Sequence, residues 1–175
     1  MNTNLRKNII TALLIAIGFI LRQIIPGTIG GMKFDLMLAV MFVCLLINQD
    51  FKNVLLTAFL GGVITAMTTT FPGGQIPNII DKFITSLVVY VIIRMLGDLK
   101  ENILFVGLIA LIGTLVSGSV FLTSALYMVG LPVPFKVLFL SIVVPTAVAN
   151  TFVTIFVYKA VKISMRSIGV KVLQK

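Results

Sequence analysis

The chain contains no histidine, which excludes a histidine-based metal site and a histidine proton relay. A single cysteine, Cys44, rules out any disulfide within one chain, and its place in an apolar run indicates a small buried residue. The five acidic residues are too few and too scattered to suggest a catalytic cluster. No Gly-x-x-x-x-Gly-Lys-Ser/Thr phosphate loop occurs, so the chain cannot supply P-loop ATP hydrolysis itself. The sequence therefore predicts neither an enzyme nor a bound cofactor or metal.

Apolar residues, by contrast, are abundant: 59% of the 175 residues are hydrophobic and 11% are charged. A bilayer core about 30 Å thick needs roughly 20 apolar residues per helix, and the chain offers six apolar runs with little left over. We predict an all-α integral membrane protein, a single domain over residues 1–175 with six transmembrane helices. The expected spans are residues 8–25, 35–47, 54–71, 77–96, 102–129 and 134–158. The second is short, and the fifth is long enough that it must tilt, break or protrude.

The distribution of lysine and arginine predicts the orientation, because cytoplasmic loops of membrane proteins carry an excess of both. With the N-terminus inside, the inner segments hold Arg6, Lys7, Lys52, Arg94, Lys100, Lys159, Lys162, Arg166, Lys171 and Lys175. The outer side then holds Arg22, Lys33, Lys82 and Lys136. We expect cytoplasmic N- and C-termini, residues 1–7 and 159–175, with the basic C-terminal tail on anionic headgroups. This distribution argues against a nucleic-acid partner.

The polar residues that are not simply solvated charges of the inner loops are expected in the outer half. Asp35 and Asp81 fall at the outer ends of the second and fourth spans, and ionisable residues near a membrane usually have a function. Residues 68–82 form a stretch rich in glycine and proline, which predicts a defined loop ending in a helix. In that helix Asn78, Asp81 and Thr85 share one face. We expect a ligand-binding centre near the outer rim.

Two later spans also present distinctive faces. Thr114, Ser117, Gly118, Phe121 and Ala125 share a face of the fifth span, which either packs closely on another helix or admits a flat aromatic ligand. In the sixth span Pro145 predicts a kink, with Thr146 and Asn150 on the face below it. In the first span Ala12 and Ala16 lie one turn apart, a spacing typical of many packed membrane helices.

These features together resemble a substrate-binding S component of an energy-coupling factor (ECF) transporter. Within that group the segments GGMKFDLM (30–37), TTFPGGQIPNIIDK (69–82) and SGSVFLTSALYMVGLP (117–132) are similar to the tryptophan-transporter family. The resemblance implies amino-acid transport in a bacterial plasma membrane, with L-tryptophan captured at the outer face. It also implies docking through the first span, by Ala12 and Ala16, on a transmembrane coupling protein driven by two cytoplasmic ATPase subunits.

A tryptophan zwitterion requires a carboxylate for its ammonium, cationic or N–H donors for its carboxylate, and an apolar slot with an acceptor for the indole N–H. We expect Asp81 to meet the ammonium, with Asp35 as the second outer acid. Lys82 can serve the carboxylate, but adjacent helix positions diverge by about 100°, so Lys33 is the alternative. The candidates for flanking the ring are Phe71, Phe121 and Tyr127, and the candidates for accepting the indole N–H are Gln75, Asn78 and Asn150.

Three other functions remain to be weighed. An S component for another small nutrient would share the architecture. An ion- or proton-coupled secondary transporter is a rival, although the chain shows no convincing inverted repeat and its charges are expected at the rim. A membrane enzyme is disfavoured, because the two outer acids lie far apart in the sequence and no histidine accompanies them.

Overall fold

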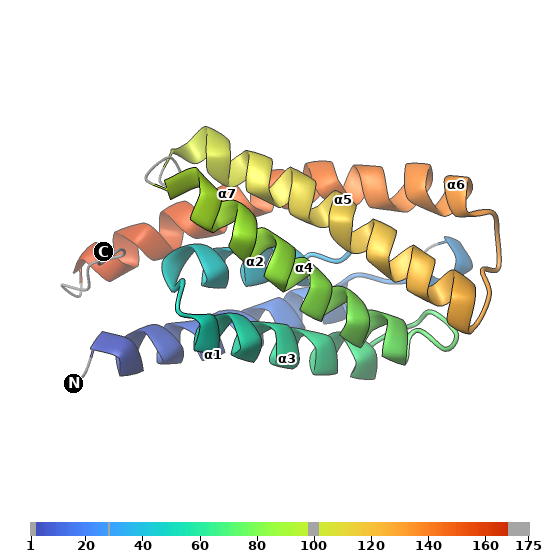
Figure 1. The fold of residues 1–175 in the computed structure, drawn as a ribbon, viewed down its shortest axis with the longest axis horizontal. Coiled ribbons are helices and arrows are strands. Elements are labelled where there is room, and N and C mark those ends of the chain that lie inside the picture. The colour runs from blue at the N-terminus through green and yellow to red at the C-terminus, as the bar shows by residue number, and fades with distance from the viewer. Residues whose placement is uncertain (1–2, 28, 98–101, 168–175) are drawn as a thin grey trace.

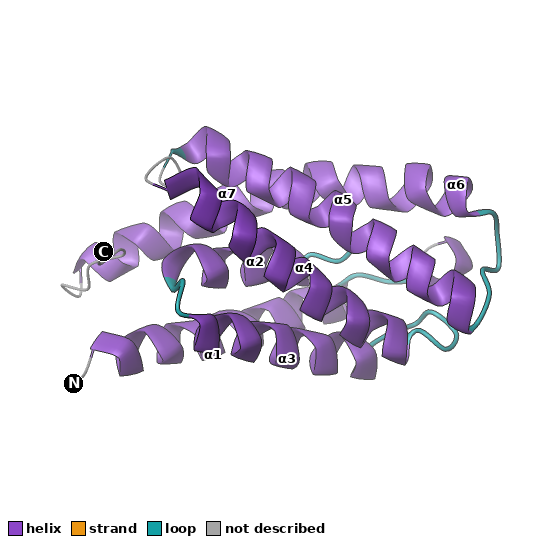
Figure 2. Ribbon diagram, in the orientation of Figure 1, coloured by secondary structure: helices purple, strands orange, loops and turns teal. Residues whose placement is uncertain are grey.

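The computed structural model describes residues 3–27, 29–97 and 102–167, and these form an all-helical bundle without a strand (Figures 1 and 2). Its long helices are α1 (Thr3–Ile24), α3 (Phe51–Met67), α4 (Gln75–Leu96), α5 (Ile103–Met128) and α7 (Val144–Ser167). The shorter elements are η1 (Ile29–Gly31), α2 (Met37–Ile47), α6 (Phe135–Leu138) and η3 (Phe139–Val143). Helix α1 begins and helix α7 ends at the same end of the bundle.

Three helical segments are long and apolar enough to cross a membrane: Lys7–Ile24, Ile103–Met128 and Phe135–Met165. The last of these joins α6, η3 and α7 without a break. Helix α4 has 22 residues but carries charged side chains, and α2 and α3 are shorter apolar helices. The helix positions agree with the predicted spans to within a few residues, except that α7 continues past residue 158 to Ser167. The helices and their apolar character indicate a multi-pass membrane protein.

Some predictions concern residues that the structure does not describe. Lys100 of the predicted inner loop, and Lys171 and Lys175 of the predicted tail, lie outside the described residues. The cytoplasmic placement of the termini and the extent of the single domain therefore remain predictions.

Helix α2 occupies the centre of the bundle and explains why the second predicted span is short. All 11 of its residues are buried, and it contacts α1, α3, α4, α5 and α7. A helix that is apolar on every side is expected to be enclosed by others. Its large side chains fit against glycines: a methyl group on Gly113 of α5 would lie 2.7 Å from the Phe42 ring, and one on Gly61 of α3 would lie 2.5 Å from the Met41 sulfur. At 1.5 Å per residue α2 is only about 16 Å long, so the chain enters the bundle through the segment before it, residues 32–36.

The buried apolar side chains form two clusters rather than one. The larger surrounds α2 and includes Phe42, Ile93 and Ile109. The smaller lies toward the loop between α3 and α4 and includes Phe71, Phe121 and Ile142. Asp81, Lys82, Arg22 and several other polar residues lie buried inside the bundle and belong to neither cluster, and Asp35 beside them is partly buried. These residues form the candidate site.

Candidate functional site

A cavity lies within the half of the bundle opposite the start of α1 and the end of α7, and the empty space in it, counted together with its open mouth, is about 490 Å³. Its walls come from α1, the segment before α2, the loop between α3 and α4, and helices α4, α5, η3 and α7. The lining residues are Arg22, Gly31, Met32, Lys33, Asp35, Leu38, Thr69, Thr70, Phe71, Asn78, Asp81, Lys82, Thr114, Ser117, Gly118, Phe121, Ile142, Val143 and Thr146.

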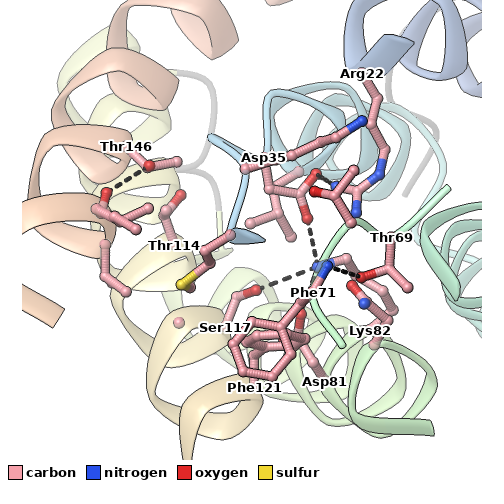
Figure 3. Close-up of a pocket in the computed structure, with 18 of the residues that line it drawn as sticks. Arg22, Asp35, Thr69, Phe71, Asp81, Lys82, Thr114, Ser117, Phe121 and Thr146 are labelled. Carbon is pink, nitrogen blue, oxygen red and sulfur yellow. Dashed lines mark hydrogen bonds and ion pairs between the residues drawn. The ribbon is translucent and has the colours of Figure 1, made fainter. Parts of the chain in front are cut away.

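One wall of the cavity is a buried cluster of two acids and two bases. Asp35 lies between the bases: its Oδ2 is 2.7 Å from Lys82 Nζ, and its Oδ1 is 2.8 Å from Arg22 Nη1. Lys82 Nζ also donates a hydrogen bond to Asp81 Oδ2. Figure 3 shows Lys82 next to Asp35 and Asp81, with Arg22 on the other side of Asp35. Arg22, Asp81 and Lys82 are each at most 4% exposed, so their charges have lost most of their contact with water. The attraction between the opposite charges must offset the cost of this desolvation.

Neutral groups complete the coordination of these charges. Thr85 Oγ1 donates to Asp81 Oδ1 at 2.9 Å, and Lys82 Nζ reaches Ser117 Oγ at 3.5 Å. Arg22 Nε donates to Thr68 Oγ1 at 2.8 Å. By contrast, the contact of Arg22 with Asp35 Oδ1 is close but not aligned as a hydrogen bond, and within the described part of the chain this oxygen accepts none. Asp35 therefore keeps capacity to accept a hydrogen bond from a ligand.

Lys33 differs from the other two cations of the cavity. It is half-buried in the lining, and among the described residues no ion pair or hydrogen bond of its side chain is found. The lining contains three cations, Arg22, Lys33 and Lys82, and two carboxylates, Asp35 and Asp81, which leaves one formal positive charge in excess. The cavity is therefore suited to a ligand that contributes a carboxylate.

The backbone of Asp35 is held from the side of the cavity that faces α7. Asn150 Nδ2 donates to the Asp35 carbonyl at 3.0 Å and to Thr114 Oγ1 at 3.1 Å. Asn150 itself is fully buried and lies behind the cavity lining. One amide thus ties the segment before α2 to α5 and α7, which keeps the Asp35 carboxylate in place.

The aromatic wall is made by Phe71 and Phe121. Their ring centroids lie 5.4 Å apart with an interplanar angle of 83°, the edge-to-face arrangement that aromatic pairs favour. Phe71 belongs to the loop before α4, where its N–H donates to Thr69 Oγ1 and its carbonyl accepts from the Gly74 N–H. Gly73 has a φ of 68°, which a residue with a side chain rarely adopts, so the glycine allows the turn that brings Phe71 inward.

The wall opposite the charged cluster is neutral and is shaped by an irregular helix. The segment Phe139–Val143 is a π turn directly before Pro145, and the Val144 N–H donates to the Phe139 carbonyl. The irregularity predicted at Pro145 therefore takes the form of a widened turn, a feature that often occurs at functional sites. A side chain on Gly118 of α5 would lie 2.3 Å from Val143, so α5 approaches this turn closely.

Seven of the ten predicted substrate-binding residues line this one cavity. They are Lys33, Asp35, Phe71, Asn78, Asp81, Lys82 and Phe121. The structure places Gln75 and Tyr127 on the exposed surface, with Tyr127 84% exposed, and neither lines the cavity. The residues of the cavity that sequence reasoning did not select for the site include Arg22, Thr69 and Thr70. Arg22 is a charged residue within an apolar run, and this feature of the sequence could have indicated that it belongs to the site.

The structure corrects the expectation that Asp81 and Lys82 point to different places. Both side chains are buried in the lining of the cavity. They also contact each other directly, although they occupy adjacent helix positions, because the long lysine side chain bends back toward the carboxylate. Arg22 and Lys82, two of the four basic residues assigned to the outer side, are buried in ion pairs.

The outward face of α1 carries the two predicted docking alanines. Ala12 and Ala16 are exposed one turn apart, and Leu13 and Ile17 beside them are 61% and 49% exposed. In a bilayer this face meets lipid or another helix. Small residues on such a face permit close approach of a partner helix.

The chain is similar to known proteins over nearly its whole length. The family model described as "Tryptophan transporter TrpP" matches residues 4–166. A protein of Clostridium acetobutylicum named "Probable tryptophan transport protein" is 43% identical over 166 residues, covering 95% of this chain and 97% of the relative. Proteins with the same name from Clostridium perfringens and Bacillus subtilis are 41% and 42% identical, covering 93% and 92% of this chain and 97% and 93% of their own lengths.

No solved structure matches the chain. The sequence matches, in contrast, extend over nearly the whole length of the chain and of each relative, so they concern the complete bundle and not a single motif. The chain therefore belongs to the tryptophan transporter family TrpP.

Proposed function

We propose that this protein binds L-tryptophan in the cavity and is the substrate-binding membrane subunit of an ATP-driven ECF-type importer in a bacterial plasma membrane. The observation that carries the proposal is the composition of the cavity, where a pair of phenylalanines lies beside two acids and three cations. An amino acid with an aromatic side chain needs an apolar wall for its ring and charged groups for its ammonium and carboxylate, all within one small cavity. Membership of a tryptophan transporter family supports the same substrate.

The substrate carboxylate is assigned to Lys33. Arg22 and Lys82 are already paired with buried acids, whereas Lys33 supplies the excess positive charge of the lining. A carboxylate beside Lys33 gives an opposite charge to the one cation of the lining that has no acid partner among the described residues. A charge-assisted hydrogen bond of this kind is stronger than a neutral one. This assignment replaces Lys82, which the sequence favoured.

The substrate ammonium is assigned to the two acids, Asp81 and Asp35. Each carboxylate offers about four acceptor positions, so contact with Lys82 does not exhaust either one. Asp35 has the more accessible side chain, 14% exposed against 1% for Asp81, and its Oδ1 accepts no aligned hydrogen bond in the described structure. The substrate ammonium then donates hydrogen bonds to the carboxylate oxygens of Asp35 and Asp81, which also contact Lys82.

Energisation is assigned to partner proteins. The chain has no phosphate loop, and the face of α1 around Ala12 and Ala16 is apolar and open. We assign this face to a transmembrane coupling protein, which in turn is driven by two cytoplasmic ATPase subunits. The orientation with cytoplasmic termini belongs to the same proposal.

The decisive experiment is direct binding of the purified protein to tryptophan, thiamine, riboflavin and biotin, measured by calorimetry in detergent. Saturable tryptophan binding at one site per chain, without binding of the three vitamins, is the expected result. Binding of a vitamin in the absence of tryptophan binding overturns the substrate assignment and leaves an S component for another nutrient.

One observation favours a second function, that of an ion- or proton-coupled secondary transporter. Such proteins place ionisable groups inside the membrane, and here Arg22, Asp81 and Lys82 are buried inside the bundle, with Asp35 partly buried between them. Uptake by cells separates the two mechanisms. Uptake that stops on ATP depletion while the ion gradients are clamped supports the ECF assignment, and uptake that follows the ion gradient supports the rival.

A further inference from the structure

The neutral wall of the cavity contains two hydroxyl groups with different hydrogen-bonding capacity. Thr146 of α7 and Thr114 of α5 both line the cavity and are 4% and 2% exposed. In Figure 3 they lie across the cavity from Arg22 and Lys82. A ligand whose charged end binds at the charged cluster therefore directs its other end toward these two residues.

The hydroxyl proton of Thr146 is already committed. Its Oγ1 donates to the Ile142 carbonyl at 2.6 Å, which leaves only lone pairs for a ligand. Thr114 differs, because its Oγ1 accepts from Asn150 Nδ2 at 3.1 Å, and in the described part of the chain its own proton has no acceptor, so it can donate to a ligand. This wall thus presents an obligate acceptor at Thr146 and a donor at Thr114.

The surroundings of Thr146 are apolar and closely packed. Ile142 and Val143 of the π turn line the cavity beside it, and Gly118 lets α5 approach Val143 closely. Phe121 supplies an aromatic face in the same lining. A flat ring fits such a slot, and a polar N–H on the ring must then meet an acceptor such as the Thr146 oxygen or remain unpaired at a cost.

We propose that Thr146 accepts the hydrogen bond of the indole N–H and thereby selects indole over phenyl side chains. The inference rests on the proposed function, because it takes tryptophan as the ligand of this cavity. Of the other candidate acceptors, two do not line the cavity and the third lies on the side of the charged cluster. Gln75 is exposed, Asn150 lies behind the lining, and Asn78 is on α4, one turn from Asp81 at the charged cluster. A phenyl ring leaves the buried Thr146 oxygen without a donor, which is how a polar site rejects an apolar analogue.

The test compares tryptophan with 3-benzothienylalanine, in which a sulfur atom replaces the indole N–H. Thr146→Val keeps the shape of the side chain and removes the acceptor. The affinity ratio of tryptophan to the analogue should fall roughly 5- to 150-fold in this variant. Thr146→Ser retains the hydroxyl and should keep the ratio of the wild-type protein.

Thr151→Val is the matched control. Thr151 lies on the same helix, donates to the Ala147 carbonyl at 2.8 Å in the same manner, and does not line the cavity. It should change neither affinity nor the ratio. If Thr146→Val does not fold, the wild-type protein alone is informative, since equal affinity for the two ligands contradicts a buried N–H contact.

Three results would overturn the assignment. Equal losses for both ligands in Thr146→Val would mean that the residue only shapes the pocket. A change of the ratio in Asn78→Leu but not in Thr146→Val would place the acceptor on α4. Tryptophan binding with an unaltered ratio in Thr146→Val refutes this inference alone, whereas absence of tryptophan binding by the wild-type protein refutes the proposed function.

Discussion

Replacing Lys82 by methionine tests how the buried charges depend on one another. Methionine matches the length of the side chain but removes the cation that contacts both Asp35 and Asp81. Asp35 keeps Arg22 at 2.8 Å, whereas Asp81 keeps neutral hydroxyl groups, among them that of Thr85 at 2.9 Å. The variant therefore leaves one buried carboxylate without a counter-charge.

The expected loss is large relative to the stability of an ordinary domain. Two unit charges 2.7 Å apart, the distance between Lys82 Nζ and Asp35 Oδ2, attract each other by about 6 kcal/mol at an effective dielectric constant of 20. Measured losses on removing one partner of a buried pair are about 3–5 kcal/mol. We expect Lys82→Met to lower the free energy of unfolding by this amount, against a total of about 5–15 kcal/mol for typical proteins.

The combination with Asp81→Asn distinguishes charge pairing from packing. Because asparagine removes the orphaned charge, the double variant should be more stable than Lys82→Met alone, by on the order of 2 kcal/mol. Reversible denaturation in detergent measures each free energy of unfolding, and Lys136→Met, at an exposed position on α6, is the control expected within about 0.5 kcal/mol of wild type. A double variant whose loss equals the sum of the two single losses would refute the coupling.

Three further predictions concern ligand binding and docking. Asp81→Asn should weaken tryptophan binding roughly 10- to 150-fold but not binding of indole propionate, which has no amine; equal losses for both ligands would remove Asp81 from contact with the ammonium. Lys33→Met should weaken tryptophan binding about tenfold and leave tryptamine, which has no carboxylate, unaffected; a matching loss for tryptamine would contradict the carboxylate assignment. Ala12→Leu or Ala16→Leu should abolish energised uptake while calorimetry still detects tryptophan binding, because added bulk blocks close helix approach. The exposed Ala160→Leu on α7 is the control for uptake, and loss of binding in the α1 variants would show that the alanines support the fold instead.

The sequence alone determined the class of the protein, the positions of most helices and the segment around which the site forms. These features depend on short-range properties: runs of apolar residues exclude water, and the glycines and prolines of residues 68–77 restrict the backbone locally. The shared face of Asn78, Asp81 and Thr85 also follows from helical periodicity, and Asn78 and Asp81 both line the cavity. Periodicity relates neighbours within one helix, so it needs no knowledge of the other helices.

Only the tertiary structure decided which of these faces meet and which side chains pair. Periodicity does not specify how a helix is rotated about its axis, so Tyr127 was as plausible a cavity residue as Phe121, yet it is 84% exposed. Arg22 pairs with Asp35 because α2 is enclosed at the centre of the bundle and the segment before it brings the carboxylate against α1. Lys82 contacts Asp81 because desolvated opposite charges stabilise each other strongly enough to bend a flexible side chain away from its helical direction. Such pairings depend on the burial of several helices at once, and that is a property of the assembled bundle.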